Sequence, residues 1–165
     1  MKFIYLFIIL LVLSNQATAL KLTKFNHDLS YPWGMTWVNS DQLLITQKKS
    51  YEILLIDTLK NTSIKIDHDI PVDGREQGGL LDIISEGNNV WITCSIKKDY
   101  GYTTAVFRAK LENNKLVDSQ LIFEALPYIT NGRHFGSRMT IKDEYLYVSI
   151  GERGKGMIAQ DPSNA

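Results

Sequence analysis

The chain has 165 residues, in which 18 Lys and Arg residues are balanced by 18 Asp and Glu residues. A net charge of zero excludes the broad basic surface that is typical of proteins that bind nucleic acid or anionic lipid, so we expect no nucleic-acid partner. The single cysteine, Cys94, excludes an intramolecular disulfide, and its apolar neighbours indicate a small buried side chain. Stability must therefore come from a hydrophobic core.

The first 19 residues have the order of a cleavable secretory signal. Lys2 gives a positive start, Phe3 to Leu13 form an apolar run, and Ala17-Thr18-Ala19 is a small-residue cleavage site. The run is far shorter than the roughly 20 residues of a transmembrane helix, so we expect no membrane anchor. The sequence thus predicts a signal peptide at 1–19 and a periplasmic or secreted mature chain at 20–165.

The mature chain consists of short segments with the composition of β-strands. These segments are rich in Ile, Val, Leu, Tyr and Trp, and clusters of polar residues or Gly, Asn and Asp separate them. The clearest are Gln42–Thr46, Glu52–Ile56, Val90–Thr93, Thr104–Arg108 and Tyr145–Ser149. No segment keeps a helical spacing of apolar residues over three turns, so the sequence predicts an all-β fold without a long helix.

One pattern occurs three times, in Gly34–Thr46, Gly79–Thr93 and Gly136–Ser149, and the copies begin 45 and 57 residues apart. Each copy has a glycine, a short strand, a polar turn and a stronger strand that ends in Thr or Ser. A further strand pair follows the first copy, at 52–56 and 62–66, and another follows the second, at 104–111 and 120–126. Four antiparallel strands at this spacing are typical of a β-propeller blade. A β-sandwich has similar strands but gives no reason for the repetition.

The pattern fills about two and a half blades, whereas propellers have roughly 4–8. An open propeller would leave sheet edges and faces unpaired. We therefore expect residues 20–165 to be the N-terminal part of a longer β-propeller domain.

Two loops carry the candidate functional side chains. Glu76 and Gln77 precede paired glycines, which permit positive φ or close backbone approach at the start of the second repeat. His134 precedes the third repeat, and a histidine can act as a general base near neutral pH. An inter-blade turn also explains Gln77, and a structural histidine also explains His134. Because the two occupy matching places in successive repeats, we expect both at one mouth of the propeller channel, where propellers bind ligands.

Two further motifs carry weaker signals. The glycines of Gly151–Gly156 do not have the order of a dinucleotide-binding loop, so we expect a loop that leaves the third hairpin, with Arg153 and Lys155 near an anionic ligand. The side chains of Asp67-His68-Asp69 would alternate between the faces of a strand, which favours an exposed loop over a metal site. We assign no metal ligand in this chain.

An ordered set of motifs between Leu29 and Asn164 resembles a known family. The motifs are YPWGMTW (31–37), QGGLLD (77–82), TAV (104–106), IFE (122–124), HFGSR (134–138), LYVSIGERG (146–154) and AQD (159–161). Together they closely resemble the soluble quinoprotein glucose/sorbosone dehydrogenase family, especially its aldose sugar dehydrogenase branch.

The resemblance implies a six-bladed propeller that binds pyrroloquinoline quinone (PQQ) and calcium. It implies the oxidation of a sugar substrate by hydride transfer to PQQ, with an external electron acceptor; no side chain accepts hydride, so a cofactor must. It also implies that His134 is the catalytic base and that Gln77 lines the pocket of the quinone and the substrate. The family's lysine and arginine contacts to the quinone, and its calcium ligands, lie in later blades outside this chain, so we expect the chain by itself to be inactive.

The chain departs from the family pattern at two places. Arg133 stands where the glucose dehydrogenase branch has an acidic residue before the histidine, and Thr46-Gln47-Lys48 stands where Thr-Glu-Arg is usual. Two alternatives stay open: a non-catalytic propeller that serves as a binding module, and a calcium-dependent hydrolytic or lactonase propeller. The presence of His134 and Gln77 favours the dehydrogenase over the non-catalytic binding module. The innermost strands offer no clear set of carboxylate or Asn ligands for the calcium that a hydrolytic or lactonase propeller would need.

Overall fold

A computed structural model describes residues 22, 24 and 28–163, and the predicted signal peptide lies outside them. The described part contains ten β-strands and one short 3-10 helix, η1 (Gly156–Gln160), which confirms an all-β fold. The strands are β1 (Pro32–Trp37), β2 (Gln42–Gln47), β3 (Glu52–Asp57), β4 (Thr62–Ile66), β5 (Leu80–Glu86), β6 (Asn89–Lys98), β7 (Gly101–Glu112), β8 (Lys115–Glu124), β9 (Gly136–Lys142) and β10 (Tyr145–Ile150). No helix in this part of the chain is long and apolar enough to cross a membrane.

The strands form two four-stranded sheets and one hairpin, each with neighbouring strands in chain order. β1 to β4 make the first sheet, β5 to β8 make the second, and β9 pairs with β10; every pairing is antiparallel. Each predicted repeat is the first hairpin of one unit, and each predicted following pair forms the outer two strands. The sequence therefore predicted the strand pairing of the described part correctly. The number of blades in the complete protein stays a prediction.

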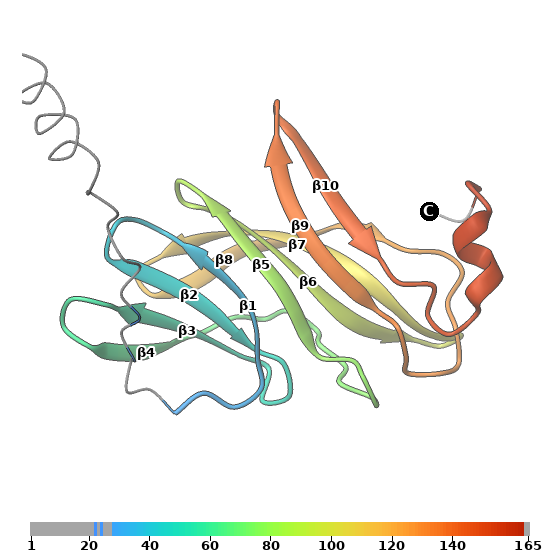
Figure 1. Cartoon of the computed structure of the whole chain (residues 1–165), viewed down its shortest axis with the longest axis horizontal. Coiled ribbons are helices and arrows are strands. Elements are labelled where there is room, and N and C mark those ends of the chain that lie inside the picture. The colour runs from blue at the N-terminus through green and yellow to red at the C-terminus, as the bar shows by residue number, and fades with distance from the viewer. Residues whose placement is uncertain (1–21, 23, 25–27, 164–165) are drawn as a thin grey trace, which may run out of the picture.

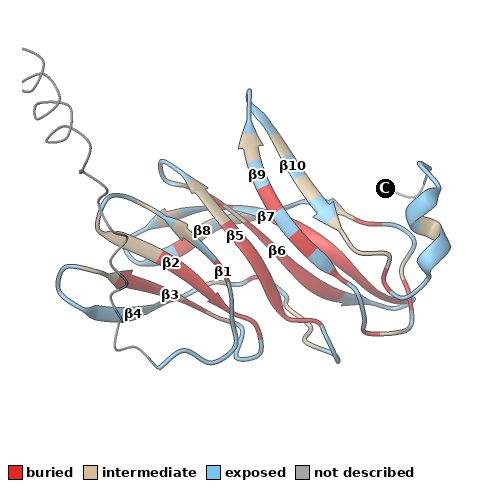
Figure 2. Cartoon of the chain, viewed as in Figure 1, coloured by how far each residue is buried: buried red, intermediate tan, exposed pale blue. Residues whose placement is uncertain are grey.

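The three units lie side by side through their first strands (Figure 1), because β5 contacts β1 and β2 on one side and β9 on the other. One hydrophobic core joins the two four-stranded sheets and includes Leu44, Ile53, Ile83, Ile92 and Phe107. Burial concentrates in the middle strands, whereas β4 and the β9–β10 hairpin are largely exposed or half-buried (Figure 2). Strands covered on both faces read as continuous apolar runs, which is why segments such as LLI and WIT stood out in the sequence.

The hydroxyl that ends each repeat has a defined structural role. Thr46 Oγ1 accepts a hydrogen bond from Gly34 N at 2.9 Å, and Thr93 Oγ1 accepts one from Asp82 N at 2.9 Å. Ser149 Oγ accepts the corresponding bond from Arg138 N at 2.9 Å. In all three units the pairing of the first two strands is interrupted by a bulge close to these residues. A bulge frees a backbone N–H from the ladder, and the hydroxyl satisfies that donor.

The same hydroxyls also connect neighbouring units. Thr46 Oγ1 donates to Leu81 O in the second sheet at 2.6 Å, and Thr93 Oγ1 receives a hydrogen bond from Ser137 Oγ in the third unit at 2.5 Å. Asp82 adds to the second junction. Its carboxylate is buried and accepts hydrogen bonds from Arg138 Nη1 at 2.9 Å and Met139 N at 2.7 Å. The junctions thus fix the loops that precede β5 and β9 relative to each other.

Candidate functional site

Gln77 and His134, the two residues singled out in the sequence, are in direct contact. Gln77 Oε1 accepts a hydrogen bond from His134 N at 3.0 Å, and Gln77 N donates to Gly132 O at 2.9 Å. The loops before β5 and β9 therefore meet, whereas their place at one mouth of a propeller channel stays a prediction. The contact runs from the Gln77 side chain to the histidine backbone, so it fixes the loop and leaves the imidazole free for other partners.

The His134 imidazole is paired with a carboxylate from the loop that follows β10. His134 Nδ1 lies in hydrogen-bonding contact with Glu152 Oε1, and Glu152 Oε2 accepts a hydrogen bond from Gly154 N at 2.5 Å. The Gly154 amide, followed by His134, holds the pKa of Glu152 below its usual value of 4.5. Glu152 is therefore ionised at neutral pH and can only accept, so the neutral imidazole carries its proton on Nδ1. Nε2 is left as the basic nitrogen.

The backbone of the 151–153 loop is locked onto the histidine. His134 O accepts a hydrogen bond from Arg153 N at 3.1 Å, and Phe135 O accepts one from Gly151 N at 3.3 Å. A Cβ at Gly151 would lie 1.9 Å from His134 O, so only glycine permits this approach. His134 has a φ of 51°, a conformation that histidine adopts more readily than bulky residues do. The imidazole is thus held by its own backbone as well as by Glu152.

Charged side chains line the exposed side of the same loops. Arg133 Nε lies 3.3 Å from Glu76 Oε2, and Arg75 Nη1 donates to Tyr102 Oη at 3.1 Å. Arg133, which departs from the family pattern, therefore has a carboxylate partner on the Gln77 loop. Both members of this ion pair are exposed, so it contributes little to stability. Its effect is on the local charge next to His134.

Arg153 does not have the position that the sequence suggested. The side chain is 3% exposed, and its guanidinium donates to Gly151 O at 2.7 Å and to Leu126 O at 2.9 Å. The expectation that Arg153 lies near an anionic ligand is not borne out, because its side chain is buried and its guanidinium binds these two backbone carbonyls. Lys155 is exposed, and Asp67 and Asp69 are exposed as expected.

The described residues fit one half of a quinoprotein site. Oxidation of an alcohol by hydride transfer needs a base beside the hydroxyl, and His134 Nε2 with Glu152 behind it supplies that base. Arg133 and Arg75, on the exposed side of these loops, contact Glu76 and Tyr102. No group of three or more His, Cys, Asp or Glu side chains suited to a metal lies within the described residues. The arrangement thus offers a base whose orientation is fixed by a carboxylate.

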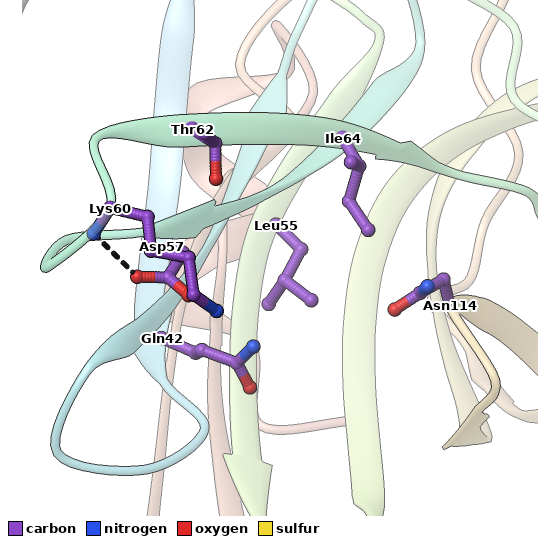
Figure 3. A pocket seen from close by; sticks show the side chains of 7 residues that line it. All are labelled: Gln42, Leu55, Asp57, Lys60, Thr62, Ile64 and Asn114. Carbon is purple, nitrogen blue, oxygen red and sulfur yellow. Dashed lines mark hydrogen bonds and ion pairs between the residues drawn. The ribbon is translucent and has the colours of Figure 1, made fainter.

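A separate pocket lies along β2, β3 and β4 of the first sheet, and Asn114 from the turn between β7 and β8 also lines it (Figure 3). Its volume is about 220 Å³, and its lining residues are Gln42, Leu55, Asp57, Lys60, Thr62, Ile64 and Asn114. Its charged groups, Lys60 and Asp57, form an ion pair of 2.9 Å with each other. The pocket shares no lining residue with the loops of Gln77 and His134.

Glu152 is the functional residue that the sequence analysis missed. The glycines and cations of the loop after β10 are its most conspicuous residues, and the carboxylate stands between them. A usable signal was present, because a general base commonly has a third group that orients it. Glu152 also comes directly after the third repeat, in the loop that leaves the hairpin of His134.

Comparison with known proteins matches the chain to one family. The Glucose / Sorbosone dehydrogenase family model matches residues 29–165. The uncharacterized protein slr1608 of Synechocystis is 34% identical over 139 residues, which cover 76% of this chain and 34% of that protein. The aldose sugar dehydrogenase YliI of Escherichia coli is 26% identical over 142 residues, which cover 81% of this chain and 38% of that protein. The chain thus spans little more than a third of the length of these relatives.

Solved structures show the same fold. A glucose dehydrogenase crystal structure superposes with a TM-score of 0.80 at 24% identity and covers 88% of this chain and 45% of its own. The PQQ-bound aldose sugar dehydrogenase of Streptomyces coelicolor has a TM-score of 0.73 at 21% identity and covers 87% of this chain and 44% of its own. The family-model match spans most of the chain, and the structural likeness agrees with it. The chain belongs to the glucose/sorbosone dehydrogenase family.

Proposed function

We propose that the protein to which this chain belongs is an exported, PQQ-dependent dehydrogenase that oxidises aldose sugars, with His134 as the general base. The observation that carries the proposal is the His134 imidazole paired through Nδ1 with Glu152, on a backbone that Gln77 holds in place, with Nε2 as its basic nitrogen. Membership in the family and the PQQ bound in the Streptomyces relative support the cofactor. Calcium, six blades and an external electron acceptor belong to the same proposal.

The residues of this chain handle the proton of the reaction. His134 Nε2 accepts the proton of the sugar hydroxyl as the C–H hydride leaves the same carbon, so the alcohol becomes a carbonyl. PQQ, when bound, would supply the hydride acceptor, and an external electron acceptor would be needed to reoxidise it. Glu152 stabilises the imidazolium that forms and keeps Nδ1 protonated, so that Nε2 is the basic nitrogen at the start of each turnover. Gln77 keeps the histidine loop in place.

A test of this proposal uses the full-length protein with PQQ and Ca²⁺ and follows dye reduction with a panel of aldoses. His134→Gln should lower kcat by about 10²–10⁴-fold, the usual contribution of a general base. Glu152→Gln should lower kcat by roughly ten-fold, because it keeps an acceptor for Nδ1 but removes the charge. His68→Gln is the matched control, since His68 contacts Tyr51 O on the first sheet and lies outside the site.

Two results would contradict the proposal, and a third would contradict the expectation that residues 20–165 are inactive alone. Sugar oxidation that survives His134→Gln would refute the role of the histidine. Binding of an aldose without any dye reduction by the PQQ-loaded protein would favour the non-catalytic binding module. Turnover by residues 20–165 alone would refute our expectation that this part of the protein is inactive by itself.

A further inference from the structure

Lys49, in the turn after β2, reaches across to the loop that carries Gln77. Its Nζ donates hydrogen bonds to Gly74 O and to Gly78 O, each at 3.2 Å, and to Glu76 O. An ammonium group has three N–H donors, and this loop presents three carbonyl oxygens to it. Three carbonyl dipoles that converge on one point repel one another, so the ammonium group stabilises the loop in this conformation.

The peptide unit between Glu76 and Gln77 is held at both ends. Its carbonyl oxygen accepts from Lys49 Nζ, and its N–H donates to Gly132 O at 2.9 Å. Glu76 has a φ of 48°, a conformation that is uncommon for a non-glycine residue and that requires support from its surroundings. Lys49 supplies that support from the first sheet, and Gly132 supplies it from the histidine loop.

We propose that Lys49 is a positioning residue for His134. It fixes the loop at Gly74 to Gly78, that loop directs Gln77 Oε1 to His134 N, and the imidazole then meets Glu152. Lys49 does not contact the imidazole. The structural part of this inference concerns contacts between loops, and only its consequence for turnover rests on the proposed function.

The experiment compares Lys49→Met with wild type in the full-length protein. Hydrogen exchange followed by mass spectrometry reports on the amides of Gln77 and His134, which are protected by Gly132 O and by Gln77 Oε1. Lys110→Met is the matched control, because it also removes an exposed ammonium and one contact, the ion pair with Asp118 at 3.1 Å. Steady-state kinetics with an aldose supply the second readout.

In Lys49→Met we expect exchange at both amides to rise at least about ten-fold and kcat to fall by about 10–100-fold, because a displacement of about 1 Å can cost 10² in rate. KM should change less than about two-fold, since Lys49 acts on the base and not on the sugar. Lys110→Met should match wild type in both readouts. If Lys49→Met does not fold, Lys49→Gln keeps two N–H donors and should show the same changes at smaller size.

The outcomes separate this inference from the proposed function. Unchanged exchange in Lys49→Met overturns it, and so does faster exchange with unchanged kcat in an active enzyme. If exchange at both amides is faster in Lys49→Met but the wild type oxidises no sugar, the positioning contacts are supported. The proposed function is then refuted instead.

Discussion

Replacing Thr46 by Val tests whether the repeated hydroxyl holds neighbouring units together. Val has nearly the same shape as Thr, so the fully buried site keeps its packing and loses only the hydroxyl. Gly34 N and Leu81 O would both lose their partner in the interior, at 2.9 and 2.6 Å in the wild type. An unsatisfied buried polar group costs about 1–3 kcal/mol, so we expect the free energy of unfolding to fall by about 2–4 kcal/mol.

The measurement is urea denaturation of the full-length protein, followed by tryptophan fluorescence, since Trp33 and Trp37 lie in β1 next to this junction. Thr46→Ser is the matched control, because it keeps the hydroxyl and loses one methyl group, at a cost of about 1 kcal/mol. The reasoning fails if Thr46→Ser destabilises as much as Thr46→Val, since packing of the methyl group would then explain the effect.

Three further predictions concern single side chains. Asp82→Ala should destabilise by about 2–3 kcal/mol in the same denaturation assay, because it leaves Met139 N without its acceptor; a loss below about 0.5 kcal/mol would contradict the role of Asp82 at the junction. In the native protein at pH 8, Cys94 should resist a thiol reagent such as DTNB, because burial raises the pKa of its thiol to about 12. It should react once the protein is denatured. Rapid labelling of Cys94 in the native protein would contradict this prediction. The pKa of Glu152 is lowered in the folded protein, so the carboxylate stabilises the fold above about pH 4.5, and this stabilisation is lost as the pH falls through the lowered pKa. Glu152→Gln should therefore lose less stability than wild type between pH 5 and pH 3. Equal losses in the two proteins would refute the assignment.

Much of the fold could be predicted because its signals are local. Segments such as Glu52–Ile56 and Tyr145–Ser149 carry strand composition, and short polar turns separate them, so consecutive strands pair as hairpins. The final Thr or Ser of each repeat was visible as a pattern, but its function was not. Only the structure shows that this hydroxyl meets a bulge and then a neighbouring sheet.

The candidate site was predicted in part, for a physical reason. Gln77 and His134 occupy equivalent loops, and equivalent loops of adjacent units meet at one edge. Glu152 and Lys49 depend instead on the path of individual loops, which positive φ values at Glu76, His134 and Arg153 redirect. Such turns have no strong sequence signal when the residue is not glycine. Arg153, which was expected near an anionic ligand, lies in the interior and binds backbone carbonyls.

The ion pair between Glu76 and Arg133 has a consequence for how relatives of this protein diverge. Position 133 carries an arginine where the glucose dehydrogenase branch has an acid, and its partner Glu76 lies on a different loop, 57 positions earlier in the chain. An acid at position 133 beside Glu76 would place two like charges together next to His134. Evolution should therefore have changed these two positions together, so that homologues with an acid before the histidine lack one at the position of Glu76.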